Sequence, residues 1–163
     1  MKPLEPPDKL HVQAAQGWCE LHAFAEADAE LDNIIASLRA HPKVLEVRWL
    51  IYANLEKWAG ALEIANAIVK LVPDWTDGWI YRANSLSELN RQQEAYEMLG
   101  ATASLFPADE IILCDLPCVC CALNGFDEAQ TWLGNAIDAG GNETKLRALD
   151  DPDLEDWKEF GRT

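Results

Sequence analysis

Four of the five cysteines lie within a stretch of eight residues, at Cys114, Cys118, Cys120 and Cys121. In a helix, Cys114, Cys118 and Cys121 share one face because they are spaced i, i+4 and i+7. Such thiols could bind zinc, but zinc needs a fourth ligand and a tetrahedral arrangement that three donors on one helix supply poorly. A cysteine without a metal packs as a small hydrophobic residue. We therefore expect a buried cysteine face and no metal site. If the C-terminal segment leaves this face uncovered, it can receive a partner's apolar side chain.

The other reactive side chains form no catalytic pattern. His11, His22 and His41 lack the spacing of a metal-binding motif, and the chain contains no phosphate-binding loop or dinucleotide-binding glycine motif. Carboxylates are dense at 151–156, but general acid–base catalysis needs them in a dry cleft. We expect an acidic tail that caps a helix and is solvated, or that meets a basic partner. The sequence thus predicts a protein that is not an enzyme, with no catalytic residue and no cofactor.

The composition narrows the choice of partners. Among 163 residues, 28 are Asp or Glu and 13 are Lys or Arg, giving a net charge of −15. Such a surface repels nucleic-acid phosphate and anionic lipids. The N-terminus lacks the apolar stretch of a signal peptide, and no segment approaches the roughly 20 apolar residues that span a bilayer. We expect a cytoplasmic protein with no transmembrane segment and no nucleic-acid partner.

An internal repeat is the main structural signal. Ala61, Ala95 and Ala129 are 34 residues apart, and the same shift relates many other apolar positions. A weaker first copy lies 31 residues before the second, pairing Trp18 with Trp49 and Pro42 with Pro73. Each unit reads as two helices, and stacked units bury a face that one hairpin leaves open. The predicted domains are an irregular segment 1–9, four hairpins at about 10–41, 42–74, 75–108 and 109–141, and a capping helix with an acidic tail at 142–163.

The third unit resembles the tetratricopeptide repeat, with Trp79, Ala83, Leu86, Ala95, Leu99 and Pro107 at the signature positions and Arg82 as a departure. The resemblance implies an all-α, tetratricopeptide-type α-solenoid. The phrases at 38–49, 78–99 and 145–157 are similar to small bacterial tetratricopeptide proteins, which include the family of bacterial kinesin light chains. That resemblance implies association with a bacterial tubulin polymer.

The family's inner surface is formed by fixed positions of the first helix in each repeat. Carried onto this chain, those positions give a candidate protein-binding groove that contains Lys43, Glu46, Leu50, Asn54, Asp77, Ile80, Asn84, Glu88, Ile111, Cys114, Cys118 and Cys121. Lys43 is the lone cation in this set, so the groove does not suit a partner's terminal carboxylate. An interaction scaffold for another protein is the predicted function. The alternative is a small chaperone that holds an apolar peptide in the groove.

The exposure of the tryptophans and the effect of Pro117 on its helix are two further questions that the sequence raises. Trp18, Trp49, Trp79 and Trp132 fall where burial is expected. Trp58 and Trp75 fall in connections, are expected to be partly exposed and are candidate exposed aromatics for binding. Capping of the local packing is the alternative that we favour for both. Pro117 either kinks its helix, which we favour, or marks a new helix capped by Asp115. An uncapped apolar end could also support self-association.

Overall fold

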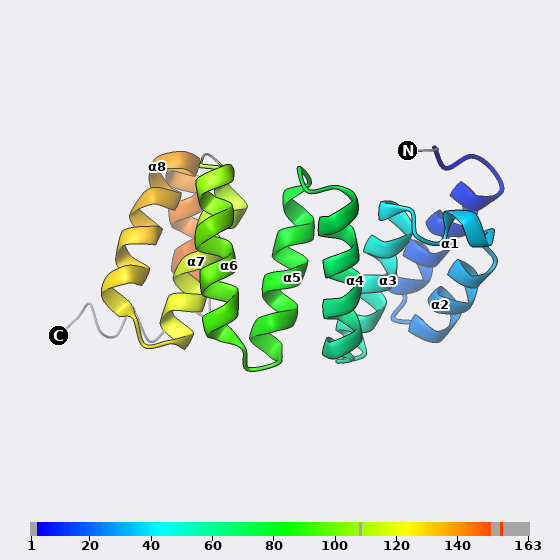
Figure 1. Ribbon diagram of the computed structural model, residues 1–163, viewed down its shortest axis with the longest axis horizontal. Helices are drawn as coiled ribbons and strands as arrows, with labels where there is room; N and C mark the ends of the chain where they lie inside the picture. The colour runs from blue at the N-terminus through cyan, green and yellow to red at the C-terminus, as the bar shows by residue number, and fades with distance from the viewer. Residues whose placement is uncertain (1–2, 108, 151–153, 155–163) are drawn as a thin grey trace. The chain divides into compact units, whose positions relative to one another are not determined.

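A computed structural model describes residues 3–107, 109–150 and 154, and within 142–150 it describes the side chain of Thr144 alone. The described residues form helices and no strand, so the predicted all-α fold is confirmed. The chain divides into two compact units, Met1–Ser85 and Leu86–Thr163. Within each unit, consecutive helices run antiparallel (Figure 1).

The N-terminal unit is built from helical hairpins. Its helices are α1 (Asp8–Glu20), α2 (Phe24–Asp32), the short 3-10 helix η1 (Ala36–Leu38), α3 (Pro42–Asn54), α4 (Trp58–Leu71) and most of α5 (Thr76–Glu88). Segment 1–9 was predicted to be irregular, but α1 already begins at Asp8. Burial of Asp8 explains this early start, because its Oδ1 accepts a hydrogen bond from the backbone N–H of Ile35 at 2.9 Å.

The C-terminal unit continues the same pattern with α6 (Gln92–Leu105), α7 (Glu110–Ala122) and α8 (Phe126–Asp150). The carboxylate of Asp109 caps α7 by accepting from the N–H groups of Ile111 and Ile112, both at 3.1 Å. A single left-handed residue, Gly141 at φ 70°, interrupts α8 and separates its first part from a further helical segment up to Asp150. Glycine suits this position because it has no Cβ to oppose positive φ.

The helix starts show that the repeat is 34 residues long throughout. The first helices of the four hairpins, α1, α3, α5 and α7, begin at Asp8, Pro42, Thr76 and Glu110. The turn after each contains one residue with φ between 55° and 60°, and these residues are His22, Glu56, Asn90 and Asn124. The predicted 31-residue shift of the first copy is therefore wrong. In the 34-residue register Ala27 joins Ala61, Ala95 and Ala129, all at 0–1% exposure.

The wrong shift arose from two prolines with different roles. Pro42 is the first residue of α3, preceded by the N-cap residue His41, whereas Pro73 lies between α4 and α5. Proline is favourable both at the first position of a helix and just beyond the end of one. A match between two prolines therefore does not fix a helical register.

Pro117 does not begin a new helix. The helix α7 runs from Glu110 to Ala122 with Pro117 inside it and fully buried, so the alternative of a restart capped by Asp115 is wrong. Proline lacks an N–H and removes one bond of the helical ladder. The buried position gives its ring apolar contacts within the unit, which offset part of this cost.

Candidate protein-binding surface

Seven of the predicted groove residues lie on two helices of the N-terminal unit. Lys43, Glu46, Leu50 and Asn54 follow one another along α3 at intervals of three and four residues, and Asp77, Ile80 and Asn84 do so along α5. These intervals place each set on one helix face. We call the two sets together the α3–α5 surface.

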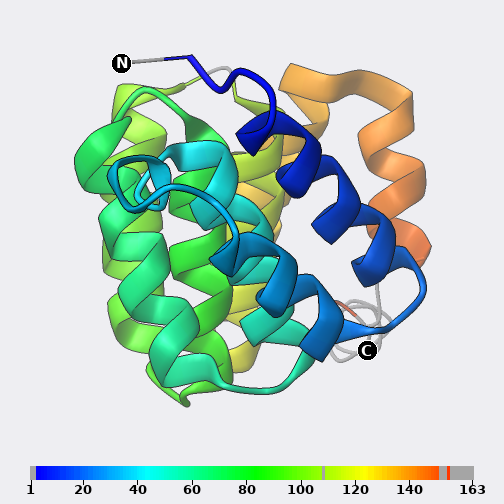
Figure 2. The same ribbon diagram turned by 90° about the vertical axis from the view of Figure 1, so that its right-hand side faces the viewer.

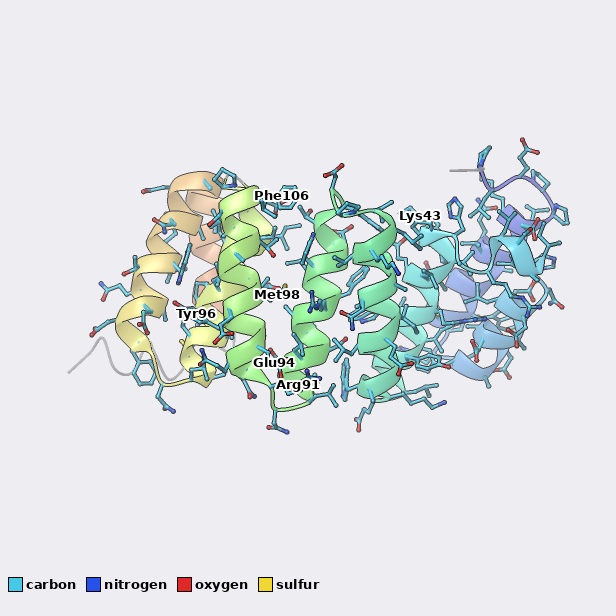
Figure 3. All side chains as sticks on the ribbon, in the orientation of Figure 1. Lys43, Arg91, Glu94, Tyr96, Met98 and Phe106 are labelled. Carbon is cyan, nitrogen blue, oxygen red and sulfur yellow. The ribbon has the colours of Figure 1, made fainter. Side chains whose placement is uncertain are left out.

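Contacts between the two helices show that these faces adjoin. The hydroxyl of Tyr81 lies 3.5 Å from Oε1 of Glu46, and the ammonium of Lys43 lies 4.8 Å from the ring centre of Trp75, just before α5. Lys43, labelled in Figure 3, also donates to Oε2 of Glu46 at 2.9 Å. The structure thus places Lys43 and Glu46 of α3 in contact with residues in the first half of α5 and just before it.

Polar side chains at this surface are held in position before any partner arrives. The indole of Trp75 donates to Oδ2 of Asp77 at 2.8 Å, while its ring faces Lys43. Trp75 was predicted to be partly exposed, and the structure places it half-buried as part of the surface. A side chain that is already ordered loses less conformational entropy on binding. The arrangement therefore favours recognition by fixed rather than mobile groups.

An aromatic pair supports the surface from below. The rings of Trp49 and Tyr81 stack with centres 4.2 Å apart and planes 17° apart. The Trp49 indole donates to the hydroxyl of Ser85 at 3.0 Å, and Ser85 donates to the carbonyl of Tyr81 at 2.7 Å. Burial, followed by the charges of Glu46 and Asp77, raises the pKa of Tyr81 well above its ordinary value. The phenol therefore stays protonated and acts as a hydrogen-bond donor.

The surface combines these fixed polar groups with apolar side chains. Leu50 is 40% exposed on α3, and Ile80 is half-buried on α5. Asn54 and Asn84 are exposed, and Asn54 donates to the carbonyl of Leu50 at 2.9 Å. Among the described residues, no group of three His, Cys, Asp or Glu side chains could hold a metal ion. The α3–α5 surface therefore presents both hydrogen-bonding groups and exposed apolar area.

The remaining predicted groove residues are in the C-terminal unit or at its start. Glu88 and Ile111 are exposed, and Cys114 and Cys118 are half-buried, with Sγ of Cys118 3.6 Å from the carbonyl of Cys114. Cys121 is only 6% exposed and packs in a cluster that includes Cys120, Ala129 and the buried Leu154. Leu154 thus covers part of the cysteine face. The predicted acidic tail otherwise lies outside the described residues.

Burial raises the pKa of two thiols. The pKa of Cys120 rises to about 11, mainly through burial and further through Glu128 and Cys121, and burial also raises that of Cys19. None of the five cysteines, all in the described part, forms a disulfide. A raised pKa keeps a thiol protonated and unreactive. Cys19 and Cys120 are thereby suited to packing rather than chemistry.

The predicted burial is correct for some of the tryptophans and wrong for another. Trp49 is buried as predicted, whereas Trp79 and Trp132 are half-buried. Trp58, predicted to be partly exposed, is half-buried against a cluster containing Trp49, Ala61 and Ala65. The prediction that Trp18 is buried is wrong, because 39% of it is exposed. In the 34-residue register Trp18 corresponds to Tyr52 and not to Trp49.

Trp18 belongs to an apolar stripe that the sequence prediction missed. Leu10, Ala14, Trp18 and Leu21 recur at helical spacing along and just after α1, and all four are exposed. The opposite face of α1 is buried through Val12, Ala15 and Cys19. Figure 2 looks onto α1 and α2 from the end of the N-terminal unit. We call these four residues the α1 stripe. The sequence already contained a signal for it, because apolar residues occur on both faces of this helix.

Comparison with known proteins identifies the fold. No family model matches the sequence, and no curated protein matches it. The solved structure "MamA RS-1 ArsTM double mutant" is similar at 16% identity and a TM-score of 0.70, over 96% of this chain and 92% of that one. "MamA MSR-1 C2" is similar at 18% identity and a TM-score of 0.65, over 85% and 76% of the two chains. MamA is tetratricopeptide-like, so the predicted tetratricopeptide-type α-solenoid is confirmed. No helix among the described residues is long and apolar enough to cross a membrane.

Proposed function

We propose that this protein is a non-enzymatic scaffold that binds another protein through the α3–α5 surface. The observation that supports it is the exposed Leu50 beside polar groups fixed by contacts between helices, above all Lys43 and Glu46. Apolar area excludes water on binding, while ordered hydrogen-bonding groups orient the partner. The fold it shares with MamA agrees with this proposal, because stacked helical hairpins expose extended surfaces for binding.

A bacterial tubulin polymer is the specific partner in this proposal. It rests on the sequence resemblance alone, and the direct test is co-sedimentation of the purified protein with assembled bacterial tubulin. We expect the protein in the pellet with polymer and in the supernatant without it. Retention in the supernatant in both cases excludes this partner. The wider scaffold proposal is then tested by the Leu50 and Leu71 variants.

The surface itself is tested with a matched pair of variants. Leu50→Glu places a charge on the α3–α5 surface, whereas Leu71→Glu places the same charge on α4 at a similar exposure of 44%. Each partner captured from the source cells by the wild-type protein is then measured for affinity with both variants. We expect Leu50→Glu to weaken binding at least about tenfold, as for a central interface residue, with little effect of Leu71→Glu. Equal affinities for the two variants refute the assignment to this surface.

The α1 stripe supports a second form of the scaffold, in which copies of the chain associate. Exposed apolar residues in a row are what one hairpin normally covers on the next. Sedimentation equilibrium would compare Leu21→Asp with Leu105→Asp, since the two leucines are 71% and 68% exposed. We expect association of the wild type and of Leu105→Asp, and a monomer for Leu21→Asp. A wild-type protein that stays monomeric at high concentration eliminates this form.

A further inference from the structure

A cleft of about 450 Å³ opens between α6 and α8 in the C-terminal unit. Small residues at its walls create the space, and the buried Leu113 of α7 contributes to its lining. From α8, Trp132, Asn135, Asp138 and Ala139 line the cleft at helical spacing, which places them on one face. Its volume is at the lower end of the range of ligand sites, so it suits one long side chain with its flanking backbone.

Carboxylates outnumber cations among the described side chains of the C-terminal unit. Residues 86–141 contain nine carboxylate side chains and a single cationic one, Arg91. Arg91 donates to Glu94 at 2.7 and 2.6 Å. Figure 3 shows this pair at one end of α6 and Phe106 at the other, the end that contributes Ala103 and Ser104 to the cleft. The separation along the helix is about 18 Å.

Asp138 is the charged member of the lining, and the described residues provide it with no ion pair. Trp132, six residues before Asp138 on α8, is half-buried, with part of its surface packed in the core cluster and part in the cleft. A cleft lined by an indole and, six residues further along the same helix, by a carboxylate matches a cation with an apolar stem. Arginine fits best, since its guanidinium stacks on aromatic rings and donates to a carboxylate through two parallel N–H groups.

We propose that the α6–α8 cleft binds an arginine side chain in an extended segment of a partner protein. The stem lies against Trp132 and Ala139, and the guanidinium pairs with Asp138. The site uses helices other than those of the α3–α5 surface, so it does not depend on the function proposed for that surface.

The test uses a blocked Gly-Ala-Arg-Ala-Gly peptide and the full chain. Nuclear magnetic resonance follows the indole N–H of Trp132, which is assigned by its loss in Trp132→Phe. Peptides with lysine, citrulline or leucine in place of arginine give the comparison, because citrulline keeps the shape and removes the charge. We expect the arginine peptide to shift the Trp132 signal at millimolar concentration, the citrulline peptide to bind about fivefold more weakly, and the leucine peptide to leave the signal unmoved.

Two variants distinguish a site from general attraction. Asp138→Asn should weaken arginine-peptide binding about fivefold, the effect of a partly screened ion pair. Asp127→Asn removes an exposed carboxylate from the same helix outside the cleft and should leave affinity unchanged. A Trp132 signal that does not move with arginine, equal weakening by both variants, or equal binding of citrulline each overturns the proposal. Leu50→Glu should not alter the peptide titration. The cleft proposal and the function proposed for the α3–α5 surface can therefore fail independently of each other.

Discussion

Replacing Ser85 by alanine should destabilise the N-terminal unit by removing one acceptor. Ser85 is fully buried, and its hydroxyl accepts from the Trp49 indole at 3.0 Å while donating to the Tyr81 carbonyl at 2.7 Å. Alanine leaves the buried Trp49 N–H without this partner, which costs about 1–3 kcal/mol. The better helix propensity of alanine returns about 0.5 kcal/mol. The net loss should be about 1.5 kcal/mol, or a fall in Tm of about 3–6 °C for a chain of this length.

Ser104→Ala is the matched control for this prediction. Ser104 is an exposed helical serine whose hydroxyl also donates to the carbonyl four residues earlier, at 3.3 Å, so the two substitutions differ mainly in the contact with Trp49. Urea unfolding followed by circular dichroism gives both free energies of unfolding. We expect Ser104→Ala to be neutral within about 0.5 kcal/mol.

A double-mutant cycle tests the physical reason directly. Trp49→Phe loses the same hydrogen bond from the donor side, so Ser85→Ala should cost less in that background than in the wild type. The coupling should be about 1 kcal/mol. Equal unfolding free energies for Ser85→Ala and Ser104→Ala, or independent effects of Trp49→Phe and Ser85→Ala, would refute the argument that this hydrogen bond joins α3 to α5.

Four further predictions concern the rest of the chain. Gly140→Ala should destabilise by about 1–3 kcal/mol, because its Cβ would collide with Oγ1 of Thr144 and lie 2.5 Å from Cδ of Glu110. Gly134→Ala, with open space around it, should instead stabilise by about 0.5–1 kcal/mol in thermal unfolding. Asp8→Ala should cost about 1–2 kcal/mol by leaving the Ile35 N–H without its acceptor at 2.9 Å, and hydrogen exchange at Ile35 should accelerate; unchanged exchange there contradicts this. The pKa of Cys120 rises from 9.0 to about 11 on folding, so its contribution to stability is full below pH 9 and is lost as the pH rises through 11. Unfolding free energies measured across this range should fall less steeply in Cys120→Ala, and an identical slope would argue against the burial of that thiol.

The sequence was sufficient for the hairpin architecture, whereas the role of the candidate surface in binding stays a prediction. A 34-residue period in Ala61, Ala95 and Ala129 requires equivalent close approaches between helices, and those alanines are buried. The tetratricopeptide resemblance supplied Lys43, Glu46 and Leu50 as inner-surface positions, and their helical spacing agrees with one shared face. What spacing could not supply was the identity of contacts between helices. The stack of Trp49 on Tyr81 and the position of Lys43 over Trp75 depend on how α3 packs against α5.

The α1 stripe shows why the first repeat was the hardest to interpret. Periodic patterns assign a residue to the core by analogy with its equivalents in other repeats. In the 34-residue register, the equivalents of Trp18 are Tyr52, Leu86 and Cys120, and Leu86 and Cys120 are 2% exposed in their own hairpins. The exposed fraction at this repeat position varies along the chain, since Tyr52 is half-buried and Trp18 is 39% exposed. Correcting the register alone would therefore still have predicted a buried Trp18. Leu21 is exposed like its equivalents Leu55 and Leu123, whereas Leu10 and Trp18 are exposed where Val44, Ile112, Leu86 and Cys120 are buried. The α1 stripe is therefore the row in which these exposed apolar residues occur together.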